Sequence, residues 1–348
     1  MPDWTQSMEQ SFEYYTVHPQ SLADIERIDT VTSASFNRDL ELESLGSATI
    51  DVMNSVGESY IRGYLKTIQN GVTEKHPLGT VLVQTPSSTF NGKVQNVSMD
   101  AYTPLVELKE NQPPLGYTLA KGTNIMNAAY DIVSEHIRVP VIRAISGKTL
   151  QYNFVANTND TWLSFVKDLI ANAEYELDID ATGQIMFAPK QDIYSLQPIW
   201  TYDDSNSSIL YPEVTVRHDW YQIPNVVKVV YSYGGEYIEA TVENNDPNSP
   251  TSIVNRGRRI TYCETNPSLS GTEKGQVEAY ARRLLEQLST VEYSITYTHA
   301  YCPVRVGDCV RLNYEAAGLT GVNARVISQT IKCEPGCPVS EKAVYTKK

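Results

Sequence analysis

The stretch YCPVRVGDCVRLNY, residues 301–314, places a Gly-Asp pair between two groups of apolar, strand-forming residues. Glycine readily adopts a positive φ, and aspartate can hydrogen-bond to nearby backbone, which are the properties that a tight turn or bulge requires. We therefore predict that Gly307 and Asp308 form a structural turn between two strands. The alternative is that Asp308 is a catalytic carboxylate beside two functional cysteines, and the rest of the chain has to distinguish these interpretations.

The cysteines do not form a recognisable metal-binding or catalytic motif. The chain has five cysteines, which is an odd number, and it starts without a signal-like segment. Both observations disfavour a disulfide framework. Structural zinc sites usually have two closely spaced pairs, and here only Cys333 and Cys337 are that close. His299 precedes Cys302 by three residues, an odd offset that would put the two side chains on opposite faces of a strand. We predict no metal site and no catalytic residue, and expect free thiols at Cys263, Cys302, Cys309, Cys333 and Cys337.

Composition and charge indicate an ordinary globular protein of 348 residues, with 41% apolar and 20% charged residues. No apolar run is long enough to span a membrane, and the start MPDWTQSMEQ lacks the features of a secretory signal, so we expect assembly in a cytoplasm. The net charge of −13 disfavours tight or sequence-specific binding to nucleic acid. It suits a surface that nucleic acid passes without sticking.

The chain alternates between strand-like and helix-like regions. Residues 20–118 contain several short strand patterns separated by glycine and proline, which predicts a first antiparallel β-domain. Residues 119–200 predict an α+β insert of helices and a hairpin, and residues 201–348 predict a second β-domain that contains one helix at 272–289. The predicted fold class is therefore β-rich α+β, with two β-modules on either side of the insert.

Two helices are predicted by matching apolar stripes with the spacing i, i+3, i+4, i+7, i+8 and i+11. The first covers residues 162–173, and Asn159 or Asp160 is the predicted N-cap. The second covers residues 277–288. Both stripes should pack against a sheet, and the core residues that we single out are Trp162, Phe165, Leu169, Leu284 and Leu288.

Other motifs carry no clear chemistry. The segment DIDATG, residues 178–183, resembles the start of a calcium loop, but Pro189 stands where the loop needs a bidentate Glu. A hairpin with an acidic edge explains it better. Acid pairs such as Glu41 and Glu43 alternate with apolar residues, as on the solvated face of a strand. The histidines form no metal-binding pattern, and nucleophile-elbow, phosphate-loop and dinucleotide motifs are absent, so no cofactor is predicted.

Several segments, taken in order, resemble the tail-hub proteins of phages and related contractile injection machines. They are GTVLVQ and FNGKVQNVSMD, then TNDTWLSFVKDLIANAEYELDIDATGQIMFAP, VVKVVYSYGGEYIEATVENND, QVEAYARRLLEQL and HAYCPVRVGDCVRLNYEAAGLTGVNARVISQTIKCEPG. The resemblance implies two tube-like antiparallel β-barrels per chain. It also implies a homotrimer whose six barrels form a pseudo-hexameric ring between a six-fold tail tube and a three-fold spike. No catalytic residue comes with it.

The same resemblance implies the partners and the location. The partners are other copies of the chain, the tail tube or distal tail protein, a spike or tip protein and the tape-measure protein, with DNA passing through the channel without sequence-specific binding. The location is the tail tip or baseplate of a virion, assembled in the host cytoplasm. Two other classes remain open from the residues alone. They are a cell-wall or polysaccharide hydrolase of the tail, and a β-rich carbohydrate-binding adhesin.

Overall fold

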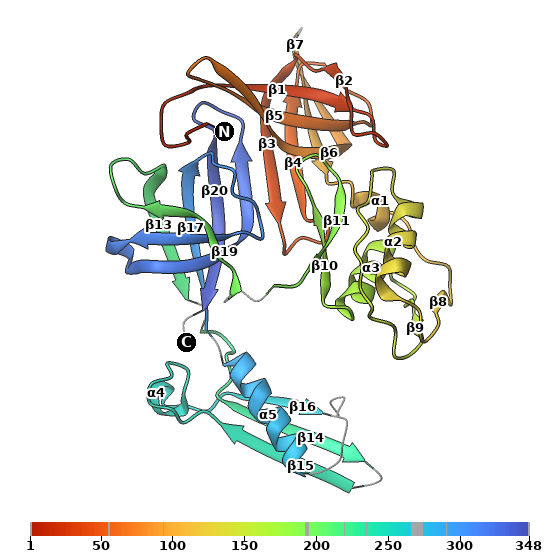
Figure 1. Cartoon of the computed structure of the whole chain (residues 1–348), viewed down its shortest axis with the longest axis vertical. Helices are drawn as coiled ribbons and strands as arrows, with labels where there is room; N and C mark the ends of the chain where they lie inside the picture. The colour runs from red at the N-terminus through yellow and green to blue at the C-terminus, as the bar shows by residue number, and fades with distance from the viewer. Residues whose placement is uncertain are drawn as a thin grey trace. The chain divides into compact units, whose positions relative to one another are not determined.

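A computed structural model describes residues 2–54, 56–92, 94–191, 195–218, 220–233, 236–265, 274–289 and 291–346. The chain divides into two compact units (Figure 1). Unit 1 comprises residues 1–214 and 296–343, and unit 2 comprises residues 215–295 and 344–348. Strands dominate and a few helices are present, so the predicted β-rich α+β class is confirmed. The predicted domain boundaries at residues 118 and 200 stay a prediction.

Seven strands near the N-terminus form what we call the first module. They lie in the order β3-β4-β7-β6-β5-β1-β2, and every pair in this path is antiparallel. The first of them begins at Glu9, before the predicted start of the β-region at residue 20. The strands are β1 (Glu9–Val17), β2 (Asp24–Arg27), β3 (Val31–Asp39), β4 (Gly46–Val52), β5 (Tyr60–Gln69), β6 (Val72–Asn91) and β7 (Val94–Tyr102).

Six strands of the C-terminal half form the second module, in the order β13-β17-β20-β19-β18-β12. The pair β18–β19 is antiparallel, whereas β12–β18 is parallel. A short 3-10 turn, Glu315–Ala317, connects β18 to β19. The strands are β12 (Pro198–Asp203), β13 (Leu210–His218), β17 (Glu292–Ala300), β18 (Cys309–Tyr314), β19 (Leu319–Lys332) and β20 (Pro338–Thr346).

The two modules are joined by direct strand pairing. Residues 35–39 at the end of β3 pair antiparallel with residues 328–332 of β19. This pairing merges both modules into a single 13-stranded sheet. Within the described residues the pairings do not return to their starting strand, so closure of either module into a barrel stays a prediction.

The insert between the modules combines three helices with two small two-stranded sheets, β8–β9 and the hairpin β10–β11. The helix α3 begins at Trp162, and its N-cap is Thr161 rather than the predicted Asn159 or Asp160. The Thr161 hydroxyl accepts from the Ser164 amide at 3.1 Å, and the Ser164 hydroxyl accepts from the Thr161 amide at 3.0 Å, which is a reciprocal capping box. The elements are α1 (Val106–Lys109), β8 (Thr118–Leu119), α2 (Ile125–His136), β9 (Phe154–Val155), α3 (Trp162–Ala171), β10 (Tyr175–Ile179) and β11 (Ile185–Pro189).

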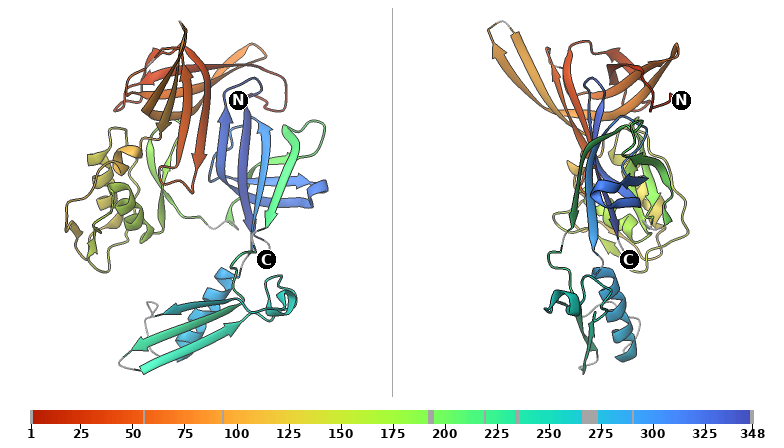
Figure 2. Two further views of the ribbon diagram at one scale, coloured as in Figure 1. Left: turned by 180° about the vertical axis from the view of Figure 1, so that it is seen from behind. Right: turned by 90° about the vertical axis from the view of Figure 1, so that its left-hand side faces the viewer.

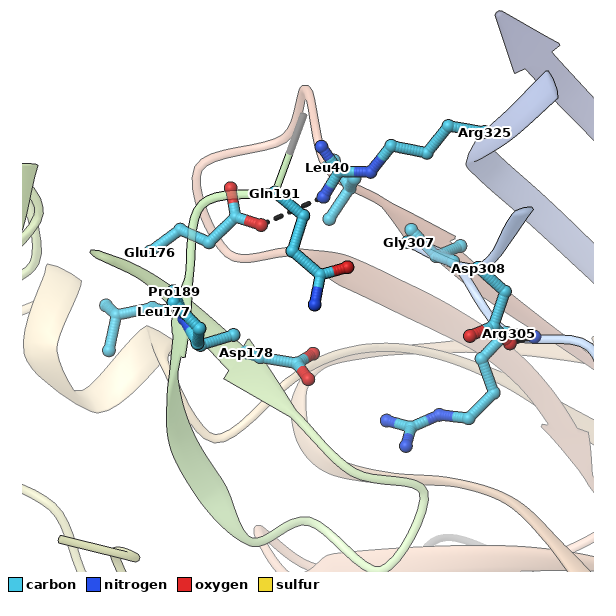
Figure 3. Close-up of a pocket in the computed structure, with 12 residues that line it drawn as sticks. Leu40, Glu176, Leu177, Asp178, Pro189, Gln191, Arg305, Gly307, Asp308 and Arg325 are labelled. Carbon is cyan, nitrogen blue, oxygen red and sulfur yellow. Dashed lines mark hydrogen bonds and ion pairs between the residues drawn. The ribbon is translucent and has the colours of Figure 1, made fainter. Parts of the chain in front are cut away.

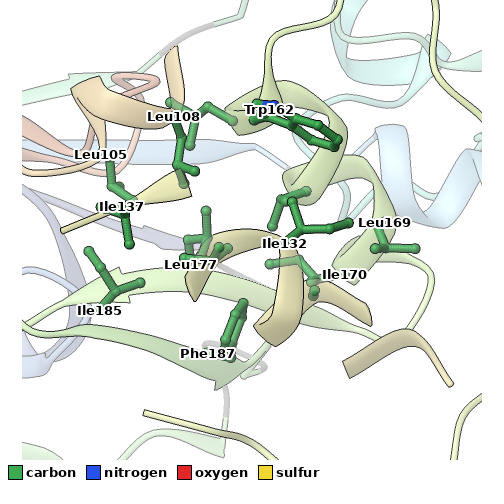
Figure 4. Close-up of a cluster of buried hydrophobic side chains, with 14 of the residues drawn as sticks. Leu105, Leu108, Ile132, Ile137, Trp162, Leu169, Ile170, Leu177, Ile185 and Phe187 are labelled. Atoms are coloured by element: carbon green, nitrogen blue, oxygen red, sulfur yellow. The ribbon is translucent and has the colours of Figure 1, made fainter. Parts of the chain in front are cut away.

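The helical stripe of α3 lies in the core of the insert. Trp162, Phe165 and Leu169 are at most 4% exposed, and they belong to one buried cluster with side chains of the β10–β11 hairpin. Figure 4 shows Leu177 and Phe187 of this hairpin in the same cluster as Ile132 of α2 and Leu169 and Ile170 of α3. The 3.6-residue period of the stripe is therefore matched by real burial on one helix face.

Unit 2 has its own small core. Its three strands lie in the order β15-β14-β16, and α5 packs on one face of them. The most buried helix residues are Val277, Ala281 and Leu285, whereas the predicted core residues Leu284 and Leu288 are half-buried and pack at the edge of the cluster. The elements are β14 (Val226–Tyr233), β15 (Glu236–Glu243), α4 (Ile253–Arg256), β16 (Thr261–Thr265) and α5 (Lys274–Leu288).

Candidate functional site at the Gly307-Asp308 turn

Gly307 and Asp308 lie in a tight turn immediately before β18. Gly307 has a φ of +97°, which is a backbone conformation that favours glycine. The Asp308 carboxylate accepts a hydrogen bond from the Arg305 amide at 2.7 Å, and the Asp308 amide donates to the Arg305 carbonyl at 3.1 Å. The Gly307 amide also donates to the carbonyl of Val326 in β19 at 2.8 Å. Asp308 thus serves the turn with both its side chain and its backbone.

The turn forms one wall of a polar pocket of about 160 Å³, and the β10–β11 hairpin forms the facing wall (Figure 3). Figure 3 shows the side chains of Asp178, from the hairpin, and Arg305, from the turn, on these facing walls. The pocket is lined by Leu40, Glu176, Leu177, Asp178, Ala188, Pro189, Gln191, Arg305, Val306, Gly307, Asp308 and Arg325.

Two arginines of the second module hold the hairpin across this pocket. Arg305 donates from Nη2 to the carbonyl oxygen of Ile179 at 3.0 Å, and Arg325 Nη2 lies 2.9 Å from the Glu176 carboxylate. The Nε atoms of both arginines are buried and have no hydrogen-bond partner within the described residues. Buried donors normally find an acceptor, so the site keeps two donors that an oxygen atom, such as that of water, could satisfy.

Burial and neighbouring arginine groups set the pKa values of two acids of the pocket. Burial raises the pKa of Asp178, and the positive charge of Arg305 opposes this rise. Burial likewise raises the pKa of Asp308, although the hydrogen bond from the Arg305 backbone opposes it. One carboxylate oxygen of Asp308 accepts a hydrogen bond within its own turn, and the pocket brings charged side chains of the turn and of the hairpin together.

A third arginine fixes the tip of the same hairpin to the first module. Arg62 is 4% exposed, and its guanidinium donates to the carbonyl of Thr182 at 2.7 Å, to the hydroxyl of Thr80 at 2.9 Å and to Asp24 at 3.1 Å. The hairpin predicted over DIDATG is present, since β10 pairs with β11. Asp180 organises its tip by accepting from the Thr182 amide at 2.9 Å and hydroxyl at 2.7 Å.

Sequence reasoning missed these three arginines as a group. Arg62 lies in YIRGYLKTI, residues 60–68, where two-residue alternation puts it on the face of Tyr64 and Lys66, opposite Ile61 and Leu65. The alternation therefore gives no local signal that Arg62 is buried. Arg305 and Arg325 carry no local signal either, because their partners come from a distant hairpin.

A second polar cluster is fully buried inside the second module. Glu341 accepts from the Tyr297 hydroxyl at 2.7 Å and from the Gln329 amide at 2.7 Å, and His299 Nε2 lies 3.2 Å from the same carboxylate. His299 Nδ1 lies 2.7 Å from the carbonyl oxygen of Ala300. Both ring nitrogens therefore face acceptors, which favours the imidazolium. Burial opposes this charge, but hydrogen bonds to Cys302 and Glu341 outweigh it and raise the pKa of His299 to about 10.

The expected separation of His299 from Cys302 is wrong. Cys302 Sγ lies 3.9 Å from His299 Nδ1, and the Tyr202 hydroxyl bridges the two side chains at 3.0 Å from His299 Nε2 and 3.2 Å from the sulfur. The strand β17 ends at Ala300, so the two-residue alternation no longer applies at Cys302. The three side chains have no solvent exposure, so a substrate cannot reach the sulfur in this structure.

The cysteines are unpaired in the structure. Cys302, Cys309 and Cys337 are buried, Cys333 is half-buried and Cys263 is exposed. Within the described ranges no group of three or more His, Cys, Asp or Glu side chains is placed to hold a metal ion. In the same ranges, no helix combines the length and the apolar character that crossing a membrane requires.

Comparison with known proteins identifies the fold. No protein-family model matches the chain, and no curated protein matches it. Among solved structures, a tail protein from Neisseria meningitidis MC58 is similar with a TM-score of 0.67 and 10% identity, over 97% of both chains. The 43 kDa tail protein of prophage MuSo2 from Shewanella oneidensis is similar with a TM-score of 0.67 and 12% identity, over 97% of this chain and 100% of that one.

A third similar structure comes from a secretion machine. The Escherichia coli protein c3393 is described as a component of the type VI secretion system with structural similarity to the T4 bacteriophage tail proteins gp27 and gp5. It matches with a TM-score of 0.51 and 9% identity, over 90% of this chain and 73% of that one. The chain therefore has the fold of phage tail proteins, and the predicted resemblance to the tail-hub family is confirmed at the level of the fold.

Proposed function

We propose that this chain is a structural hub protein of a phage tail tip or baseplate. Three copies form a pseudo-hexameric ring that joins a six-fold tail tube to a three-fold spike or tip and surrounds the DNA channel. The observation that carries the proposal is the presence of two strand modules in one chain, joined side by side through β3 and β19. Three such chains supply six modules, which suits a closed ring.

In this role the chain is a structural component of the tail rather than an enzyme. The turn at Asp308 and the arginines around it hold the insert against both modules. The buried His299, Cys302 and Glu341 support the second module from within. The partners are the tail tube or distal tail protein, a spike or tip protein, the tape-measure protein and further copies of the chain. A net charge of −13 keeps passing DNA from sticking.

The proposal is tested on the purified full-length chain. Light scattering coupled to size-exclusion chromatography gives the mass, and negative-stain electron microscopy shows whether particles have a central channel. We expect a mass of three chains and annular particles. A monomer at every concentration, or a ring of six copies, would contradict the proposal. A mass of three chains without a channel would contradict the ring while leaving the trimer.

A further inference from the structure

The two modules have the same strand order. In the first module the path is β3-β4-β7-β6-β5-β1, and in the second it is β13-β17-β20-β19-β18-β12. Read along the chain, both modules use their strands in the same succession, so β3 corresponds to β13 and β6 corresponds to β19. One difference is that β1 pairs antiparallel with β5, whereas β12 pairs parallel with β18. The strand edges of one module therefore have counterparts on the corresponding strands of the other module.

The pairing of β3 with β19 shows how one such edge is used within the chain. The strand β19 pairs with β18 up to Arg325, and from Ser328 the next residues pair with β3. The partner residues are the last five of β3, which has nine residues. At the junction, the end of β3 thus pairs with the part of β19 that extends beyond its pairing with β18.

The equivalent edges of β6 and β13 are unpaired in the described part of the chain. The strand β6 pairs with β5 up to Leu82, and from Thr85 to Asn91 it pairs with β7 on one edge alone. The strand β13 ends the sheet path and pairs with β17. Both β3 and β13 have nine residues, so the part of β13 that corresponds to the paired last five residues of β3 is Val214–His218. Earlier in β13, the Pro212 carbonyl accepts a hydrogen bond from the Tyr314 hydroxyl at 2.7 Å.

The β6–β7 ribbon extends away from the rest of its module (Figure 2). Residues 85–92 are all exposed, and Phe90 is 70% exposed. A two-stranded ribbon with both faces in water is marginally stable, and an open strand edge promotes association. None of the residues Thr85–Asn91 is charged, so the edge presents no charge to repel an approaching strand.

We propose that residues 214–218 of β13 in one copy pair antiparallel with residues 85–89 of β6 in the next copy, and so repeat between chains the β3–β19 junction within the chain. The inference rests on the proposed trimeric ring and names the strands that close it. The matched register places Val216 opposite Ser87, as Asn37 stands opposite Thr330. Pro86 lacks an amide donor, so this junction has fewer backbone hydrogen bonds than β3–β19.

Cysteine cross-linking tests the register in the full-length chain. Cys263→Ser removes the exposed native thiol, and Ser87→Cys with Val216→Cys is added to it. After mild oxidation with oxidised glutathione, two thiols form one disulfide and two glutathione molecules are released. We expect a ladder up to a covalent trimer on a non-reducing gel. The controls are Ser87→Cys with Arg217→Cys, and Ser11→Cys with Val216→Cys. They should cross-link about tenfold less, because a shift of one residue moves a side chain to the other face of a sheet, and Ser11 lies on a different edge.

A second variant shortens the ribbon and charges its edge. Residues 89–96 are replaced by Asn-Gly, which forms a tight hairpin turn between the paired residues Ser88 and Val97. Ser87→Lys adds a charge to the remaining edge, and circular dichroism and thermal unfolding verify the fold. We expect this variant to be monomeric. A trimer by light scattering that survives the deletion, or that shows no Ser87–Val216 cross-link above the controls, overturns the inferred junction and leaves the ring standing. An unmodified chain that is monomeric at every concentration overturns the ring, and the junction with it.

Discussion

Arg62 Nη2 donates a 2.7 Å hydrogen bond to the carbonyl oxygen of Thr182, although the two residues lie 120 positions apart in the chain. The same guanidinium binds Asp24 and the carbonyl of Leu22. We expect Arg62→Met to lower the free energy of unfolding by on the order of 3 kcal/mol, because it leaves buried acceptors without their donor. Urea denaturation of the full chain measures this loss. Arg27→Met is the control, since that side chain is half exposed and its ion pairs contribute at most about 1 kcal/mol. Equal effects would contradict the role of Arg62.

Neighbouring leucines of α5 provide a matched test of the small core in unit 2. Leu285 is 6% exposed, whereas Leu284 is half-buried at the edge of the cluster. We expect Leu285→Ala to cost about 2–5 kcal/mol through the cavity that it leaves. Leu284→Ala should cost clearly less, because water already reaches part of that side chain. Thermal unfolding of both variants compares them, and a larger loss for Leu284→Ala would contradict the placement of the helix face.

Two glycines with positive φ should respond differently to alanine. At Gly307, with φ of +97°, a Cβ atom would meet nothing within 4 Å, so Gly307→Ala carries backbone strain alone, about 1–2 kcal/mol. At Gly183, with φ of +91°, a Cβ atom would lie 2.9 Å from Cβ of Thr80. We therefore expect Gly183→Ala to lower the unfolding midpoint in urea further. A smaller effect at Gly183 would mean that the hairpin tip relaxes away from Thr80 without loss.

The buried pair of His299 and Glu341 predicts a dependence of stability on pH. The pKa of His299 is raised from 6.5 to about 10 in the folded chain. A raised pKa means that the folded state holds the proton more tightly, so this stabilisation is full below about pH 6.5 and is lost as the pH rises toward 10. We expect His299→Gln to flatten the decline in the free energy of unfolding over this range. Tyr202→Phe should keep the decline, because it leaves the His299–Glu341 contact in place. An unchanged pH profile for His299→Gln would contradict the charged pair.

Thiol labelling should distinguish the five cysteines. Cys263 is exposed, and burial raises the pKa of Cys309 and raises that of Cys333 to about 12, which keeps these thiols protonated and unreactive. We expect one rapid reaction with a chromogenic disulfide in the native chain at pH 8, and further reactions after denaturation. Cys263→Ser should abolish the rapid reaction. Rapid labelling that persists in this variant would show that another thiol is accessible.

Local patterns in the sequence were sufficient to predict the two helices with long apolar stripes and the fold class. The stripe that contains Trp162 and Phe165 lies on the buried face of α3, and the stripe around Leu284 lies in α5. Both helices could be predicted because the 3.6-residue period is set by neighbouring residues alone. The precise face of α5 was less predictable. Half-buried Leu284 and buried Leu285 adjoin in the sequence, and the sheet beneath the helix decides which of them faces inward.

Contacts between distant segments could not be predicted in this way. The pairing of β3 with β19 joins Phe36 to Ile331, and neither segment carries a signal that specifies the other. His299 and Cys302 meet because β17 ends at Ala300, and a shift of that boundary by two residues would have kept them apart. The first strand, Glu9–Val17, lies before the predicted β-region, which starts at residue 20. Whether such a segment forms a strand depends on packing against its partner β5 as much as on its own residues.

The elements from β14 to α5, which form the small core of unit 2, lie in the chain between β13 and β17, although these two strands are neighbours in the sheet. During synthesis on the ribosome, β13 therefore emerges long before the strand that holds it, and the intervening residues 219–291 must be spanned first. If this segment folds around its own core first, its chain is already ordered. Less entropy is then lost when the loop between β13 and β17 is closed. The first module and the insert, by contrast, are complete once residue 190 has emerged. The strand that we infer to join one copy to the next thus enters its sheet only when the chain is nearly finished, which delays association until each copy has folded.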